Sequence, residues 1–178
     1  FTINCTFNYN ISGYITSLIS TTDFNTITDI PDYCFFRLFD GARIIYAKDL
    51  ITDNIINIGI SSFYKLFNSC SLLRTAPTFN NVVNVSQNGF RDCFNNCHEL
   101  VEPPTFDKIT SVGNEGFTYS FLWCSSLVTA PKFQSLTTID EQGFYGTFRA
   151  CQALKNAPTF ESLTSTGQEV FNECFQEC

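Results

Sequence analysis

A fixed step of 27 residues runs through this chain and constrains its fold more than any other feature of the sequence. Proline and leucine each keep that step in one column, and phenylalanine keeps it in three. The cysteines that keep it are Cys70, Cys97, Cys124, Cys151 and Cys178. A period of roughly 20 to 50 residues is the signature of repeat arrays, in which each unit buries its apolar face against its neighbours. The chain is therefore expected to fold as a solenoid.

The repeat also accounts for an unusual composition, with 20 phenylalanines and no methionine among 178 residues. The three columns are Phe63, Phe90, Phe117, Phe144 and Phe171, then Phe67, Phe94, Phe121, Phe148 and Phe175, then Phe79, Phe106, Phe133 and Phe160. Phe24, Phe35 and Phe39 extend the pattern toward the N-terminus, where the step from Phe39 to Phe67 is 28 and indicates one inserted residue. We interpret the columns as a stacked core rather than as an aromatic binding surface.

One unit, from Cys124 to Cys151, predicts a strand, a turn and a helix. Residues 127–133 are β-prone and contain a proline that cannot donate a ladder hydrogen bond, which indicates a short exposed strand. Phe144, Phe148 and Cys151 follow at positions i, i+4 and i+7, the spacing of one helix face. A column of acceptable helix N-caps precedes them: Ser86, Gly113, Asp140 and Gly167. The predicted fold class is an α/β repeat, a solenoid of about six 27-residue strand–turn–helix units with a short N-terminal cap.

These residues resemble a known family. The run ITSVGNEGF (109–117), Phe121 and CSSLVTAP (124–131) are similar to the BspA-type leucine-rich repeat of bacterial surface proteins. FNTITDIP (24–31) and YCFFRLF (33–39) resemble the opening unit of such arrays. The resemblance covers about residues 18–178, and an extra Phe-x-x-x-Phe turn departs from the family's commoner, shorter unit. It implies an extracellular or cell-surface leucine-rich-repeat array, adhesion to host or neighbouring-cell molecules, and no catalysis.

Residues 1–17 match no repeat column, and we expect them to form an N-terminal cap or the end of a preceding domain. The chain begins at Phe1 without methionine and stops at Cys178, so we expect a fragment of a longer protein whose array continues. The net charge of −7 argues against nucleic acid and anionic membranes as partners, because both need a basic face. No stretch approaches the roughly 18 consecutive apolar residues of a transmembrane helix, and none is typical of a signal peptide, so we expect no membrane insertion.

The nine cysteines and the single histidine form no recognisable metal or catalytic motif. No C-x-x-C pair occurs, and His98 alone cannot supply the usual Cys/His zinc spacing. Helices packed roughly 8–10 Å apart would hold the column cysteines beyond disulfide range, so we expect buried free thiols. Adjacent Cys97 and His98 are expected to point apart, which does not suit a nucleophile and its base. We therefore expect no catalytic residue, no metal site and no cofactor; an enzyme would need a domain outside this sequence.

Columns that vary between units indicate where a ligand could bind, because the core dictates the columns that do not vary. Outward side chains of successive strands lie roughly 4.8 Å apart and form a continuous surface. The candidate ligand-binding residues are Arg74, Thr75, Thr78, Val101, Glu102, Thr105, Val128, Thr129, Lys132, Lys155, Asn156 and Thr159. The alternative is an ordinary solvated strand face. The segment does not alternate at period two, so a one-residue shift in register would change which column faces outward.

Two functions remain open from the sequence. The first is a non-enzymatic recognition and adhesion module of a secreted or surface-anchored bacterial protein, which binds a protein or glycan ligand through the strand face. The alternative is a structural spacer or assembly protein whose copies self-associate through the uncapped C-terminal repeat or stack with sister subunits, for example on a phage or other particle. A spacer should bind no external ligand and should self-associate as its concentration rises.

Overall fold

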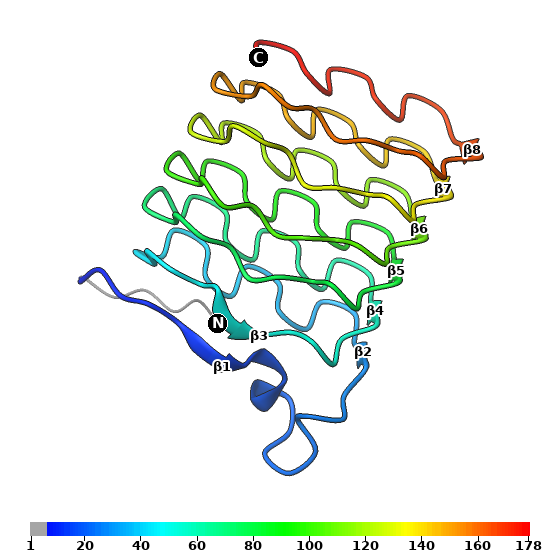
Figure 1. The fold of residues 1–178 in the computed structure, drawn as a ribbon. Coiled ribbons are helices and arrows are strands. Elements are labelled where there is room, and N and C mark those ends of the chain that lie inside the picture. The colour runs from blue at the N-terminus through cyan, green and yellow to red at the C-terminus, as the bar shows by residue number, and fades with distance from the viewer. Residues whose placement is uncertain (1–6) are drawn as a thin grey trace.

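The chain forms a solenoid of stacked coils, and the computed structural model describes residues 7–178 of it (Figure 1). One parallel sheet runs along the array with the strand order β2-β4-β5-β6-β7-β8. Its strands are β2 (Asp29–Ile30), β4 (Asn57–Ile58), β5 (Asn84–Val85), β6 (Ser111–Val112), β7 (Thr138–Ile139) and β8 (Ser165–Thr166). Each coil contributes one of these two-residue strands, so about five turns of the chain separate β2 from β8. The predicted solenoid is confirmed.

The strand register reproduces the step read from the sequence. Asn57 pairs with Asn84, and Asn84 pairs with Ser111, so equivalent residues of these coils are 27 apart. Asp29 pairs with Asn57, 28 residues later. This pairing confirms the inserted residue between the first two units. The outward amides also join neighbouring coils, because Asn84 Nδ2 donates to Asn57 Oδ1 over 2.7 Å.

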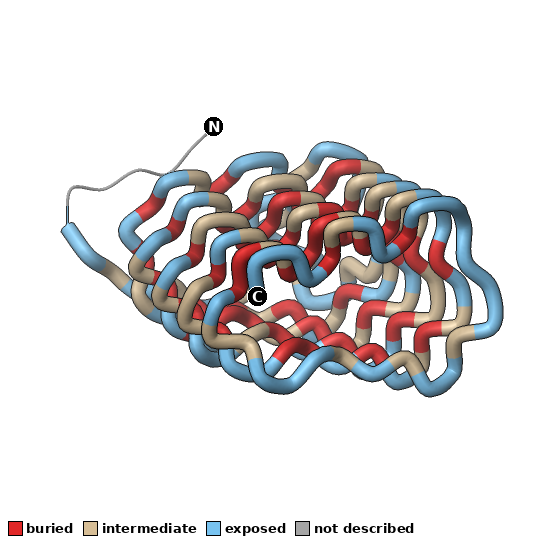
Figure 2. The backbone as a smooth tube through the Cα atoms, turned by 90° about the horizontal axis from the view of Figure 1, so that it is seen from above, coloured by how far each residue is buried: buried red, intermediate tan, exposed pale blue. Residues whose placement is uncertain are grey.

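Three columns of phenylalanine fill the interior, as predicted. Rings of successive coils lie with their centroids 5.1 to 6.0 Å apart in these columns. The third column meets the first edge-on, as in the pair Phe106 and Phe117 at 5.0 Å and 76°. Figure 2, seen along the array, shows buried residues on the facing sides of the two walls that each coil forms. The aromatic composition is therefore explained by ring stacking along the solenoid.

The predicted helix is wrong. Within residues 7–178 the structure contains no α-helix, only the short 3₁₀ helix η1 (Ile15–Leu18). In the segment expected to be helical, every fourth residue has a positive φ, as at Gln142 (54°), Gly146 (56°) and Ala150 (58°). We call the equivalent segments the turn runs; they span residues 33–41, 61–69, 88–96, 115–123, 142–150 and 169–177.

Backbone hydrogen bonding explains why these segments form turns instead of a helix. Tyr145 N donates to Gln142 O over 3.0 Å, which closes a turn, whereas Phe144 N donates to Val170 O of the next coil over 3.1 Å. The two kinds of bond alternate along the runs from 33–41 to 142–150. Helices pack roughly 8–10 Å apart, but the stacked rings hold successive coils at little more than 5 Å. A phenylalanine at i and i+4 suits both structures, and the short distance between coils selects the turns.

The predicted strand over residues 127–133 is misplaced. That segment contains one isolated bridge, between Thr129 and Asn156, and the strand of this coil is β7, which follows it. Pro131 lies in the segment and is buried. Because proline cannot donate a ladder hydrogen bond, a continuous strand does not form there.

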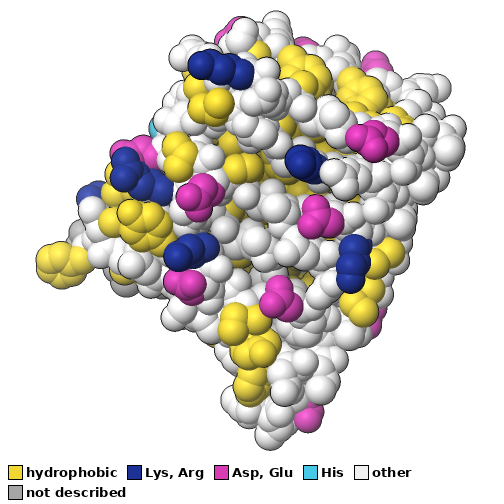
Figure 3. All heavy atoms as spheres, viewed as in Figure 1, with side chains coloured by type: hydrophobic (Ala, Val, Ile, Leu, Met, Phe, Trp, Pro, Cys, Tyr) yellow, Lys and Arg dark blue, Asp and Glu magenta, His cyan; other side chains and the backbone are white. Residues whose placement is uncertain are grey.

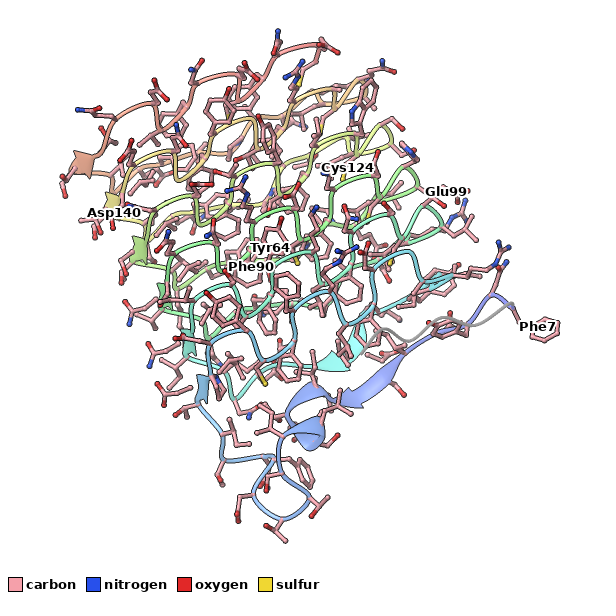
Figure 4. The ribbon with its side chains drawn as sticks, turned by 180° about the vertical axis from the view of Figure 1, so that it is seen from behind. Phe7, Tyr64, Phe90, Glu99, Cys124 and Asp140 are labelled. Carbon is pink, nitrogen blue, oxygen red and sulfur yellow. The ribbon has the colours of Figure 1, made fainter. Side chains whose placement is uncertain are left out.

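The segment that precedes the first coil packs against its outer side. β1 (Ser12–Tyr14) pairs in parallel with β3 (Asp49–Ile51). η1 follows β1 directly and buries Ile15, which is 2% exposed. Figure 4 shows Phe7 projecting away from this end of the solenoid. Residues 1–6 of the predicted cap lie outside the described residues, and the domain boundary at residue 17 stays a prediction.

Candidate functional site

The candidate site lies on the wall of the solenoid opposite the turn runs. We call this wall the front face; it consists of the exposed residues of segments 72–84, 99–111, 126–138 and 153–165. Isolated parallel bridges between Thr75 and Glu102 and between Thr129 and Asn156 place equivalent positions of neighbouring coils side by side. Figure 3 shows this face, with charged side chains of both signs dispersed among uncharged ones. The continuous surface expected from the sequence is therefore present.

Ten of the twelve candidate residues are exposed on the front face. They are Arg74, Val101, Glu102, Thr105, Val128, Thr129, Lys132, Lys155, Asn156 and Thr159. The sequence left open which of two adjacent columns faces outward, and the structure shows that both do in three of the four coils. In residues 127–133 the side chains of Ala130, Pro131 and Phe133 point inward. Two of these residues are adjacent, so inward and outward positions do not follow the regular alternation of a strand.

Thr75 and Thr78 are the candidate residues that the structure does not fully expose. Thr75 is 6% exposed, and its bridge partners Tyr46 and Glu102 flank it on both sides. Its Oγ1 is buried without a hydrogen-bond partner. Thr78 is half-buried. Thr75 is therefore corrected from a ligand-contacting residue to a buried one, because larger neighbours cover it.

Arg74 lies beside Thr75 but on the surface. Its Nε is 3.0 Å from Glu99 Oε2, and the two side chains are 54% and 45% exposed. An ion pair this exposed contributes no more than about 1 kcal/mol. Arg74 can therefore exchange this contact for a ligand at little energetic cost.

Two exposed valines interrupt the polar surface. Val101 and Val128 occupy the same column in adjacent coils and are 51% and 42% exposed. Charged residues lie near both valines: Glu102 follows Val101 directly, and Lys132 lies four residues after Val128. A small apolar area bordered by polar groups is the usual arrangement at a recognition surface. This mixture distinguishes the centre of the front face from a purely polar wall.

Charge is divided unequally between the two walls. The wall of the turn runs holds nine of the 17 acidic residues and four of the ten basic ones. This count covers the turn runs and the residues that lead into and out of them, which are 31–42, 59–70, 86–97, 113–124, 140–151 and 167–178. Some of these charges pair across coils, as Arg149 does with Glu173 at 2.7 Å. Most of the net negative charge therefore lies on the wall of the turn runs, and the rest of the chain is close to neutral.

The cysteine column forms a ladder of hydrogen bonds within the core. Cys97 Sγ donates to Phe67 O over 3.2 Å and Cys124 Sγ to Phe94 O over 3.1 Å, each reaching the preceding coil. The cysteines among the described residues are free thiols, and those at 70, 97, 124 and 151 are fully buried, as predicted. The sequence argument for free thiols was wrong in its reason, because it assumed helices about 8–10 Å apart. In the structure, each thiol of the column is held by a carbonyl group.

The buried thiols predict a loss of stability at alkaline pH. Burial raises the pKa of Cys70 and of Cys151 to about 12, from an ordinary value of 9.0. The pKa of each thiol is higher in the folded chain than in the unfolded one. The stability that the protonated thiols contribute is therefore complete below pH 9 and is lost as the pH rises toward 12. The free energy of unfolding, measured with urea at successive pH values, should fall there by up to about 1.4 kcal/mol per pH unit for each thiol. Cys124→Ala should reduce the slope, and an equal slope in this variant would contradict the explanation.

Cys97 and His98 do not contact each other as a nucleophile and its base would, because each bonds to a backbone carbonyl of a different coil. Burial raises the pKa of the Cys97 thiol well above its usual range, which keeps it protonated and a poor nucleophile. His98 Nδ1 lies 3.0 Å from Trp123 O, a backbone carbonyl of the next coil. Among residues 7–178 no three metal-ligating side chains gather at one point. None of the helices in that part of the chain has the length and apolar character needed to span a membrane.

A hollow at the edge of the front face was not predicted from the sequence. It encloses about 360 Å³ near the sheet edge and is lined by the segment before β2 and by three coils. Asn54, Asn81 and Lys108 lie at its wall and occupy one column, each 27 residues after the last. A column of polar residues is expected on any solvated wall, so the sequence alone does not distinguish this one.

Comparison with known proteins gives two similar structures. No model of a known protein family matches the chain, and no curated protein matches it. A crystal structure from Bacteroides ovatus is 22% identical with a TM-score of 0.41, covering 84% of this chain and 45% of that one. A cell surface protein from Faecalibacterium prausnitzii is 24% identical with a TM-score of 0.45, covering 83% of this chain and 41% of that one. The first is a leucine-rich repeat protein, and the second is described as leucine rich.

The chain spans less than half the length of either of these two proteins. At these identities and TM-scores neither likeness bears on function.

Proposed function

We propose that this chain is a non-enzymatic recognition module of a bacterial surface or secreted protein, which binds a protein or glycan through the front face. The supporting observation is the division of each coil into repeating and varying positions. The repeating residues fill the core, as Phe117 and Cys124 do, whereas varying residues lie on the surface, and those of the front face include Val101 and Lys132. Neighbouring coils thus present different side chains about 4.8 Å apart on a rigid support.

The chemistry of the front face favours recognition over simple solvation. Exposed Val101 and Val128 supply apolar area at its centre, and Arg74, Glu102 and Lys132 supply charges of both signs around them. A ligand can therefore bury apolar surface and satisfy polar groups in the same contact. The excess negative charge on the opposite wall makes that wall the less suitable one for an acidic ligand.

A binding screen with a matched control tests this proposal. The triple variant Arg74→Ala, Glu102→Ala, Lys132→Ala should lose at least about tenfold in affinity for any immobilised extracellular-matrix protein, glycan or cell that the unmodified chain binds. The control, Arg37→Ala, Lys65→Ala, Glu141→Ala, removes the same charges from the turn-run wall and should bind unchanged. Equal binding by both variants would overturn the assignment of the front face.

A further inference from the structure

We propose that the hollow at the edge of the front face is a binding site for a neutral saccharide unit. This proposal names a ligand class for the recognition function proposed above and rests on it. The hollow lies between the segment that precedes β2 and the next three coils, so its wall combines side chains from four parts of the chain. Its volume of about 360 Å³ lies within the range of ligand sites and accommodates a single sugar ring.

The polar groups at the wall include several that are free to bind a ligand. The Asp53 carboxylate and the Asn25 amide have no partner among the described residues, and both side chains are exposed. Lys108 Nζ uses one of its protons to bond Asn81 Oδ1 over 2.7 Å and retains two. The hollow thus offers both acceptors and donors, which is what a sugar hydroxyl group, itself donor and acceptor, requires.

Hydrogen bonds across the coils hold part of this wall in place before a ligand arrives. Asn81 Nδ2 donates to Asp53 O over 2.7 Å, while its Oδ1 accepts from Lys108, so the residue links three consecutive coils. Asn54 Nδ2 donates to Phe24 O and Ile27 O, over 3.0 and 2.5 Å. Asn54 Oδ1 is buried with no hydrogen-bond partner. A buried unpaired acceptor costs about 1–3 kcal/mol and marks a position at which a donor is missing.

The apolar part of the hollow suits the carbon-bound hydrogens of a sugar ring. Ile56 is 38% exposed, which is unusual for isoleucine, and Val83 beside it in the next coil is half-buried. Both line the hollow. An aliphatic surface next to amide, carboxylate and ammonium groups matches the two-sided character of a pyranose, whose ring face is apolar and whose rim carries hydroxyl groups.

Charge at the hollow selects a neutral ligand. Lys108 opposes a cation, and Asp53 opposes an anion. A zwitterion such as an amino acid could pair with both charges. The other polar groups at the wall are uncharged amides and two hydroxyls, which favour a neutral ligand with several hydroxyl groups. They belong to Asn25, Thr26, Thr28, Asn54 and Asn81. A sugar unit is therefore the ligand class that uses the whole wall.

Ligand-observed NMR with free sugars tests this assignment. The probes are D-glucose, D-galactose, D-mannose and N-acetyl-D-glucosamine, with D-glucosamine, D-glucuronate and glycine as charged comparisons. At least one neutral sugar should bind saturably with a Kd of roughly 1 mM to tens of mM, as expected for a single ring in an open site. Asp53→Asn and Lys108→Ala should each weaken that binding about tenfold, the value of one charge-assisted hydrogen bond.

The matched control is Asp107→Asn, which removes an exposed carboxylate next to Lys108 in sequence but outside the hollow. It should leave sugar binding unchanged. Absence of neutral-sugar binding up to about 0.1 M, tighter binding of glycine or a charged sugar, or equal binding by Asp53→Asn and the unmodified chain would each overturn the proposal. Both test positions are exposed, so neither variant is expected to unfold the chain.

These outcomes separate the hollow from the wider function. If the triple variant at residues 74, 102 and 132 abolishes binding of a large ligand while no sugar occupies the hollow, the recognition function stands and the sugar site fails. If a sugar binds and Asp53→Asn weakens it while the triple variant changes nothing, the sugar site stands and the location of the larger surface fails.

Discussion

Replacing Phe117 with alanine is expected to lower the free energy of unfolding by about 3–5 kcal/mol, the usual cost of removing a buried aromatic ring. Phe117 is fully buried at the meeting point of two ring columns. Its centroid lies 5.1 Å from that of Phe90 and 5.2 Å from that of Phe144 in its own column, and 5.0 Å from that of Phe106. The ring therefore supports three successive coils, and its loss leaves a cavity that stacked neighbours cannot fill by small movements.

The matched control is Phe171→Ala, in the same column but at the last described coil. Phe171 is already 39% exposed, and its centroid lies 6.0 Å from that of Phe144. Its replacement should cost about 1 kcal/mol, in proportion to the smaller area it buries. Urea denaturation followed by circular dichroism measures both values. Similar losses for the two variants would contradict a core built by ring stacking.

Replacing Trp123 with proline is expected to cost at least about 3 kcal/mol, although the side chain is on the surface. Trp123 has a φ of 62°, which proline cannot adopt because its ring fixes φ near −65°. Its N–H also donates to Arg149 O of the next coil over 3.1 Å, and proline has no N–H to replace it. The variant thus removes one bond between coils and forces a different backbone at the same point.

Trp123→Gly is the control, and it also separates the turn run from the helix that the sequence predicts. Glycine keeps the N–H and adopts a positive φ freely, so relief of strain should stabilise the chain by up to about 1–2 kcal/mol. The Trp123 side chain is 41% exposed, and the free energy of the packing lost with it is subtracted from this gain. In a helix the same change would destabilise by roughly 1 kcal/mol. Trp123→Ala loses the same packing but keeps the strained φ, so the sign of the difference in urea midpoint between Trp123→Gly and Trp123→Ala decides between the two. Destabilisation by glycine as large as by proline would exclude the turn geometry.

The repeat step, the insertion and the core columns could all be predicted from the sequence. A residue that must stack on its equivalent in the next coil has to recur at a fixed step, so Phe90, Phe117 and Phe144 record the architecture directly. The insertion before Phe67 is detectable for the same reason, and the 28-residue pairing of Asp29 with Asn57 confirms it. Most of the front face followed as well, because positions outside the core are free to vary.

The local conformation of each coil was decided by the tertiary structure. Phe144 and Phe148 at i and i+4 fit a helix or a run of four-residue turns equally well, so their spacing cannot separate the two. The helix and the turns differ in the acceptors of alternate backbone N–H groups. In the turns these acceptors belong to the next coil, as Val170 O does for Phe144 N, 26 residues earlier in the sequence. Burial of Thr75 and the hollow beside Asp53 likewise arise from side chains of adjacent coils. The sequence by itself determined which residues stack on one another; the close approach of the coils decided the backbone geometry and the surface that this stacking produces.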